Sequence, residues 1–228
     1  MERKHPEWHI QDDVLNYISQ PFIFFHDHVW FRTQDGNRHE ISSWDMILAF
    51  PPCTHLAGSG ATWFKQKRDD GRQRTAIEFF CEFLNAKAPY IAIENPVGIM
   101  SGDYVATWYP ELCHKYGLPI KYNQIIHPYQ FGHPVSKKTC LWLKGLPGLV
   151  PTDIVTPERK GNGYSGNLYY ATKDGKALRY NDPLTAKIRS KTYPGIAKAM
   201  ATQWCLYVFQ VEKLGRKIEN PEWKLEEW

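Results

Sequence analysis

The chain lacks several features that would place it in a specialised class of proteins. It has no Cys-x-x-Cys pair, and its cysteines are odd in number and widely spaced, at positions 53, 81, 113, 140 and 205. Neither a disulfide framework nor a metal site is therefore predicted. The longest apolar runs, such as residues 46–52, fall far short of the roughly 20 residues that span a bilayer. No apolar signal core follows the charged residues 1–5, so we expect a cytoplasmic protein with no membrane partner.

Internal repeats are also missing, and the composition is that of an ordinary globular protein. With 228 residues, of which 43% are hydrophobic, the chain suffices for one core and is too short for two comfortable domains. We predict a single domain over residues 1–213 and a loosely packed tail over residues 214–228. The net charge of +4 permits a polyanionic partner without requiring one.

Two strand, loop and helix repeats mark the middle of the chain. Residues 44–50 form an apolar run that ends at a Pro-Pro corner, which is typical of a buried strand. Apolar residues at helical spacing predict a helix over residues 70–86, and residues 90–93 form a second buried strand. This repeat predicts an α/β fold with a mostly parallel sheet flanked by helices, and a site at the carboxyl ends of the strands.

The flanking segments carry weaker signals. A strand-like run at residues 8–10 precedes an expected hairpin within residues 22–41, which turns at Asp35-Gly36-Asn37. Residues 139–143 read as a further strand, and residues 194–213 as a closing helix. Between the last two lies a stretch rich in glycine, lysine and tyrosine, which predicts an exposed basic loop at residues 156–180.

Two residues stand where reactive groups are expected. Cys53 follows the Pro-Pro corner at a strand end, which suits an exposed nucleophile, although a single cysteine is more often a small buried thiol. Glu94 ends the neighbouring strand, where an acid can also simply cap the next helix. Cytosine C5 becomes nucleophilic when a thiolate adds at C6 and an acid protonates N3. A cysteine and a glutamic acid at adjacent strand ends can supply these two roles to a base turned out of its stack.

Four short motifs follow one another in a recognisable order. They are Pro52-Cys53, Glu94-Asn95-Pro96, the segment at residues 129–139 and Thr192-Tyr193-Pro194-Gly195. They resemble, in turn, the Pro-Cys loop, the Glu-Asn-Val motif, the Tyr-Gly-x-Pro-Gln-x-Arg-x-Arg segment and the closing cofactor motif of the cytosine-C5 DNA methyltransferases and their small, often phage-borne relatives. The resemblance covers roughly residues 8–210.

The resemblance implies a Rossmann-like, methyltransferase-type fold, S-adenosylmethionine as cofactor and double-stranded DNA as partner. Cys53 and Glu94 would be the catalytic pair. The residues that it assigns to the cofactor are Asp12, Asp13, Pro52 and Thr192. Those that it assigns to nucleic acid are Asn95, Lys137, Lys138, Arg189 and Lys191. The chain departs from the family at Val135, Lys137 and Thr139, where Gln, Arg and Arg are the rule, so bidentate contacts there become single or are lost.

The first strand of the family, with its Gly-rich cofactor loop, and the acidic strand end after it would precede residue 8. Residues 1–7 are too few to form them, so we expect a shortened fold with an exposed sheet edge. The chain can be a remnant that binds cofactor poorly, its hairpin can cover the edge, or a second copy or another chain can complete the sheet. Two other functions also remain open: a DNA-binding decoy without catalysis, and a different modification at pyrimidine C5.

Overall fold

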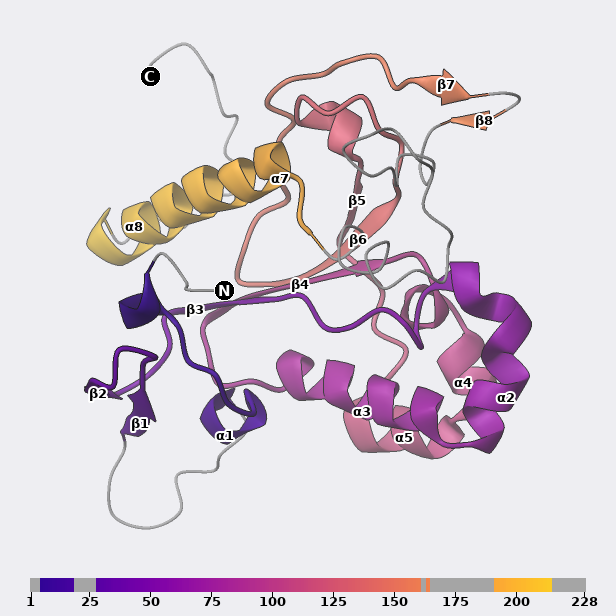
Figure 1. Cartoon of the computed structure of the whole chain (residues 1–228), viewed down its shortest axis with the longest axis horizontal. Coiled ribbons are helices and arrows are strands. Elements are labelled where there is room, and N and C mark those ends of the chain that lie inside the picture. The colour runs from indigo at the N-terminus through magenta and orange to yellow at the C-terminus, as the bar shows by residue number, and fades with distance from the viewer. Residues whose placement is uncertain (1–4, 19–27, 161–162, 165–190, 215–228) are drawn as a thin grey trace.

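The apolar strands predicted from the sequence lie in one mixed sheet. The computed structural model describes residues 5–18, 28–160, 163–164 and 191–214, and its largest sheet has the strand order β3, β4, β6, β5 (Figure 1). These strands are β3 (Met46–Ala49), β4 (Tyr90–Pro96), β6 (Thr139–Lys144) and β5 (Gln124–Ile126). β3 pairs in parallel with β4, whereas β6 runs antiparallel to both β4 and β5.

The prediction of a mostly parallel sheet is therefore wrong. A parallel pair needs a crossover connection, and α3 (Arg72–Leu84) lies in the connection between β3 and β4. After β5, however, the chain reverses direction within residues 127–138 and returns as β6 between β5 and β4. The α/β class holds, while the finer Rossmann-like assignment stays a prediction. Among the strands in the described ranges, only β3 and β4 pair in parallel.

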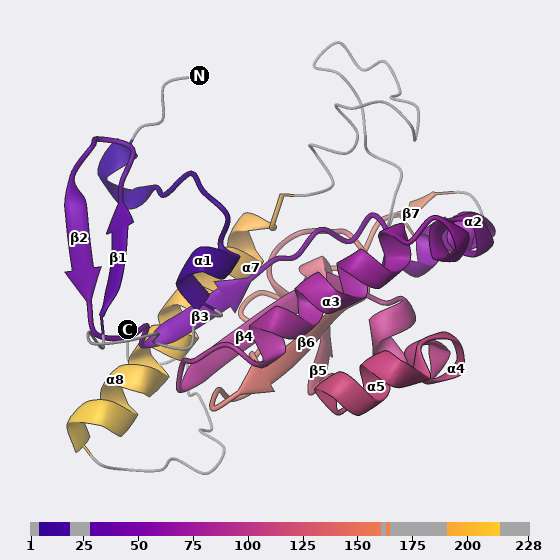
Figure 2. The ribbon, with the colours of Figure 1, turned by 90° about the horizontal axis from the view of Figure 1, so that it is seen from below.

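Strand β4 is the centre of the core because both of its faces are buried. Successive side chains of a strand point to opposite faces, and here they enter different hydrophobic clusters. Ile93 packs in a cluster with Phe80 of α3, whereas Ala92 packs in a cluster with Trp204 near the carboxyl end of the described chain. Figures 1 and 2 show α3 and the C-terminal helices on opposite faces of the sheet. A sheet flanked by helices is thus confirmed.

Both long helices predicted from periodicity are present. The helix expected over residues 70–86 is α3, whose apolar side faces the sheet. The helix expected over residues 194–213 is continuous but contains a π-helical turn. Its three parts are α7 (Pro194–Ala199), η5 (Met200–Trp204) and α8 (Cys205–Leu214).

The amino-terminal segments differ partly from expectation. No strand forms at residues 8–10, because Pro6–Trp8 is the 3-10 helix η1, and α1 (Leu15–Ile18) follows. The predicted turn is confirmed: Gly36 has φ of 89°, and the turn joins β1 and β2 in a two-stranded sheet of their own. The bounds are Val29–Arg32 for β1 and Arg38–Ile41 for β2. Within the described chain only β4 pairs with β3, so this hairpin does not extend the main sheet (Figure 2).

The remaining elements are short. They are η2 (Gly58–Trp63), α2 (Phe64–Asp69), η3 (Ile99–Ser101), α4 (Tyr104–Trp108), α5 (Pro110–Tyr116), η4 (Pro128–Gln130), β7 (Arg159–Lys160) and β8 (Gly163–Tyr164). In the part of the chain that the structure describes, no helix has the length and apolarity needed to cross a membrane. Most of the predicted basic loop at residues 156–180, and all but the first residue of the predicted tail at 214–228, lie outside the described residues.

Candidate active site

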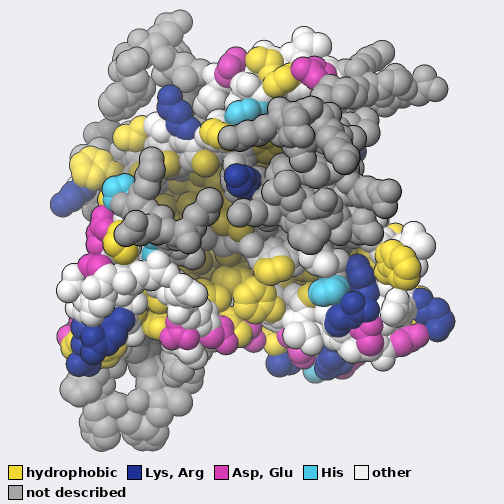
Figure 3. Space-filling model, viewed as in Figure 1, with side chains coloured by type: hydrophobic (Ala, Val, Ile, Leu, Met, Phe, Trp, Pro, Cys, Tyr) yellow, Lys and Arg dark blue, Asp and Glu magenta, His cyan; other side chains and the backbone are white. Residues whose placement is uncertain are grey.

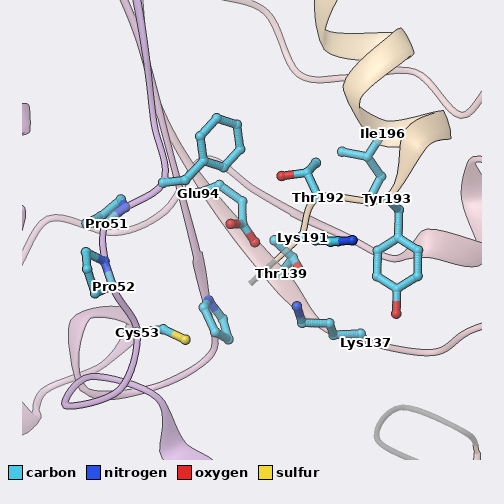
Figure 4. A pocket seen from close by; sticks show the side chains of 12 residues that line it. Pro51, Pro52, Cys53, Glu94, Lys137, Thr139, Lys191, Thr192, Tyr193 and Ile196 are labelled. Atoms are coloured by element: carbon cyan, nitrogen blue, oxygen red, sulfur yellow. The ribbon is translucent and has the colours of Figure 1, made fainter. Parts of the chain in front are cut away.

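Cys53 and Glu94 come together because β3 and β4 are parallel neighbours in register. Ala49 pairs with Ile93, so the loop after β3 and the end of β4 emerge at the same edge of the sheet. Pro51 and Pro52 turn the chain immediately before Cys53. Cys53 and Glu94 then line one pocket (Figure 4).

The loop that carries Cys53 is held to the end of β4 and to the loop after β4 by direct hydrogen bonds. The buried side chain of Asn95 donates from Nδ2 to the carbonyl oxygen of Pro51 over 2.9 Å. The backbone N–H of Ile99 donates to the Leu56 carbonyl over 2.9 Å. Gly98 lies at this crossing, and an added Cβ would stand 2.1 Å from the Leu56 oxygen. The two loops therefore form one unit that fixes the position of Cys53 relative to Glu94.

The pocket is small and lined by groups of different chemistry. Its lining consists of Phe50, Pro51, Pro52, Cys53, Glu94, Pro96, Lys137, Thr139, Lys191, Thr192, Tyr193 and Ile196. In Figure 4 the sulfur of Cys53, the carboxyl of Glu94 and the side chain of Lys137 lie around a common space. The cavity measures about 90 Å³, whereas sites for drug-sized ligands occupy roughly 300–1,000 Å³. It has the size for one small ring.

Burial makes Glu94 a weaker acid than a carboxyl in water. Desolvation raises the pKa of the Glu94 carboxyl above its ordinary value, because the charged form loses water. The nearby Lys137 ammonium and a hydrogen bond from the Thr139 side chain lower this pKa, but by less. The net shift is upward, which favours the protonated form that can donate to a ring nitrogen.

Cys53 differs from the two cysteines in the core. Cys81 and Cys140 are fully buried, and burial raises their thiol pKa to about 12 and about 11 respectively. Such thiols fill space and are inert. Cys53 is only partly buried, and it lines the pocket. The functional interpretation of Cys53 is therefore favoured over that of a thiol sealed in the core.

Four further residues singled out from the sequence also line the pocket: Pro52, Lys137, Lys191 and Thr192. Thr192 lies just before α7, and this segment is held to the chain after η4 by a hydrogen bond of 3.0 Å from Gly195 N to His133 Nε2. An added Cβ at Gly195 would stand 1.9 Å from the Phe131 carbonyl oxygen, so the two segments touch through their backbones.

Several other predicted site residues lie elsewhere. Asn95 is 1% exposed and bonded to Pro51, which corrects its predicted contact with nucleic acid to a role in positioning the Cys53 loop. Asp12 and Asp13 do not line the pocket. The Asp12 carboxylate accepts from Tyr17 over 2.6 Å, and that of Asp13 from the N–H of Leu15 over 3.0 Å, so both stabilise the start of α1. The cofactor role predicted for them is not supported.

The last two predicted nucleic-acid contacts are not placed in the pocket either. Lys138 is exposed and outside the lining, whereas Arg189 lies outside the described residues.

The sequence interpretation misses the role of Thr139. The sequence marks this residue only as a replacement for arginine, yet its side chain is hydrogen-bonded to Glu94. A signal is present, since Thr139 opens the strand predicted at residues 139–143 and that strand could pair with β4. The antiparallel register places Thr139 opposite Pro96, two residues from Glu94 along β4. Without the strand pairing, this neighbour relation is not visible.

The described residues do not form a complete site for S-adenosylmethionine. Pro52 and Thr192 line the pocket, but Glu94 is the one carboxylate in its described lining, so no second acid is there to hold ribose hydroxyls. No group of three or more His, Cys, Asp or Glu side chains in the described regions is arranged to hold a metal ion.

Searches against protein families, curated proteins and solved structures find no match to this chain.

Proposed function

We propose that the chain is a cytosine-C5 DNA methyltransferase-like protein that acts through a covalent adduct of Cys53. The observation that carries the proposal is the shared pocket of a partly buried thiol and a desolvated carboxyl. The cavity of about 90 Å³ beside these two groups suits a single planar ring better than a large ligand. Cys53 and Glu94 each have a specific role in a reaction on such a ring.

The thiolate of Cys53 adds to C6 of a cytosine that has left its stack, and Glu94 gives its proton to N3. Addition at C6 and protonation at N3 place the electron pair of the C5–C6 double bond at C5, which then attacks an electrophilic carbon and displaces its leaving group. Solvent water accepts the C5 proton, the thiolate leaves C6, and the N3 proton returns to the Glu94 carboxylate, so that the aromatic ring and both catalytic groups are restored. General acid catalysis of this kind contributes about a hundredfold to ten-thousandfold in rate.

The other pocket residues support binding. The Thr139 side chain is hydrogen-bonded to Glu94, and the charge of the Lys137 ammonium acts on its carboxyl. Lys191 adds a second cationic side chain to the lining, which suits a ligand with a phosphate next to the base. S-adenosylmethionine enters the proposal as methyl donor through the family resemblance alone, and no step above is derived through it.

The experiment is a transfer assay with labelled S-adenosylmethionine and double-stranded DNA. Wild-type protein is expected to label the DNA, and Cys53→Ala to lose this activity. Cys205→Ala is the matched control, because Cys205 is an exposed cysteine on α8 outside the pocket. Equal transfer by wild type and Cys53→Ala would remove the mechanism. Mass analysis of the nucleosides also reveals any other group added at C5.

A non-catalytic DNA-binding protein is the second candidate. It is favoured by the positions of Asp12 and Asp13, which leave the cofactor without the contacts expected from the resemblance. Titration calorimetry separates the two candidates. Heat from S-adenosylmethionine at micromolar concentrations supports the enzyme, whereas heat from DNA alone supports the binding protein.

A further inference from the structure

Two exposed tryptophans flank α2, the helix that follows the Cys53 loop and η2. Trp63, at the end of η2, is 61% exposed, and Trp108, at the end of α4, is 52% exposed. Between these elements, Arg68 of α2 places its guanidinium carbon 3.8 Å from the ring centre of Trp108 and also donates to the hydroxyl of Tyr104. We call Trp63, Arg68 and Trp108 the tryptophan surface.

This surface is joined firmly to the pocket. η2 continues directly into α2, and it begins five residues after Cys53. The buried Lys67 of α2 donates from Nζ to the carbonyl of Thr54, the residue after Cys53, over 2.7 Å. Gly58 N donates to the Val97 carbonyl over 3.1 Å, which fixes the start of η2 to the loop after β4. The tryptophan surface and the Cys53 loop therefore belong to one bonded unit.

The chain around the tryptophan surface is cationic. Residues 65–74 contain five lysine or arginine side chains and two aspartates. Lys65 pairs with Asp69, Arg72 with Asp70, and Arg74 with Glu78 and Glu111. None of the ion pairs among the described residues involves Arg68, whose guanidinium instead stacks on Trp108. Figure 3 shows Lys and Arg side chains beside exposed hydrophobic ones on the side of the molecule formed by α2. Large exposed rings interleaved with cations are the features that bind a polyanion through its bases and its phosphates.

We propose that the tryptophan surface binds a nucleic-acid strand, with unpaired bases stacked on Trp63 and Trp108 and phosphates near Arg68. Base stacking on aromatic side chains tolerates any base, because each base has a π-face. A substrate that reaches both this surface and the pocket is a polymer, and not a free nucleotide. The inference rests on the proposed function only in naming the bound strand as the one that carries the target base.

The hairpin provides a matched control. Trp30 of β1 is 43% exposed, and Arg38 of β2 lies 3.9 Å from its ring centre, so the same Trp and Arg pair recurs. This pair lies at the opposite end of the molecule from α2 and α4 (Figure 1). Trp30→Ala therefore removes an equivalent pair of a tryptophan and an arginine and leaves the tryptophan surface unchanged.

The test is fluorescence anisotropy with a short labelled single-stranded oligonucleotide. Trp63→Ala and Trp108→Ala are each expected to weaken binding about fivefold or more, the low end of what one base stack contributes. Trp63→Phe should retain most of the affinity, and Trp30→Ala should match wild type. Melting curves by circular dichroism check that each variant is folded.

Unchanged affinity in both alanine variants would overturn the inference, as would the absence of binding by wild type to any single strand. Wild-type protein that binds other proteins but no oligonucleotide would also overturn the inference. Cys53→Ala separates this question from catalysis, because it should bind the oligonucleotide like wild type. If the tryptophan variants lose binding while wild type transfers no methyl group, the surface stands and the proposed function fails. If the tryptophan variants bind the oligonucleotide normally and wild type transfers the methyl group, the inference about the surface fails and the proposed function stands.

Discussion

The side-chain amide of Asn95 and the carbonyl oxygen of Pro51 are joined by a buried hydrogen bond of 2.9 Å. It links the strand that carries Glu94 to the corner that carries Cys53, across 44 residues of sequence. The Oδ1 atom of Asn95 is buried, and within the described structure it has no hydrogen-bond partner. A buried oxygen without a partner carries a cost in stability.

Asn95→Ala should destabilise the protein and misplace Cys53. Loss of the donor leaves the buried Pro51 carbonyl unpaired, which costs about 1–3 kcal/mol. Urea unfolding measures this loss, and the transfer assay measures the accompanying fall in activity. Asn16→Ala is the control, because Asn16 is exposed on α1. Equal unfolding midpoints for wild type and Asn95→Ala would show that the bond does not hold the corner.

Gly98→Ala should loosen the crossing between the two loops. Its Cβ would meet the Leu56 oxygen at 2.1 Å, so the backbone must shift. We expect a loss of about 1–3 kcal/mol, as for other overpacked sites, seen as a lower thermal midpoint. The control is Gly102→Ala, because an added Cβ at Gly102 meets nothing within 4 Å. A midpoint for Gly98→Ala as high as that of the control would contradict the close approach.

Glu94→Gln should lose activity and gain stability at neutral pH. The amide cannot supply a proton, so turnover should fall about a hundredfold or more. Burial raises the pKa of Glu94 in the folded protein above its ordinary value of 4.5. The folded state then binds the proton more tightly than the unfolded chain, so the carboxyl lowers stability as the pH rises from 4.5 through the raised value.

Thermal melts at several pH values check this sign. The midpoint of Glu94→Gln relative to wild type should rise across that pH range and stay level above it. A relative midpoint that falls with increasing pH would mean that the Glu94 carboxylate is stabilised and not desolvated.

Lys137→Met should move the pH profile of the reaction. The Lys137 ammonium lowers the pKa of Glu94, so its removal raises that pKa further. The activity that depends on protonated Glu94 should then persist to higher pH, even if substrate binding weakens. Lys138→Met is the control, since this exposed neighbour does not line the pocket. If activity falls at the same high pH in wild type and in Lys137→Met, the Lys137 ammonium does not affect the pKa of Glu94.

Thiol labelling should separate Cys53 from the core cysteines. Brief treatment with iodoacetamide at mildly alkaline pH is expected to modify Cys53 and the exposed Cys205. Cys81 and Cys140 should stay unmodified, because they are buried and their pKa values of about 12 and about 11 keep them protonated. Peptide mass mapping reads the result. Labelling of Cys81 before Cys53 would contradict the positions assigned to both.

The elements that periodicity predicts well are those whose burial dominates their local sequence. α3 and the strand at Tyr90–Pro96 carry apolar residues at the spacing of a helix face or of a doubly buried strand, so their type can be predicted from the chain alone. Residues 8–10 are less decisive, since Pro6 favours the first turn of a short helix over a strand. The direction of β6 in the sheet cannot be predicted from the sequence either, because β6 contains no local signal that it inserts beside β4.

The sequence by itself determined the chemical groups and their places at strand ends: Cys53 after a Pro-Pro corner and Glu94 at the end of an apolar run. Local periodicity suffices for this, because burial on both faces leaves a continuous apolar pattern. Only the tertiary structure decided which polar groups share the pocket. It brought Thr139 to Glu94, turned Asn95 inward and left Asp12 and Asp13 at the start of α1. Such relations depend on strand pairing and loop contacts between residues distant in sequence, and no local pattern encodes them.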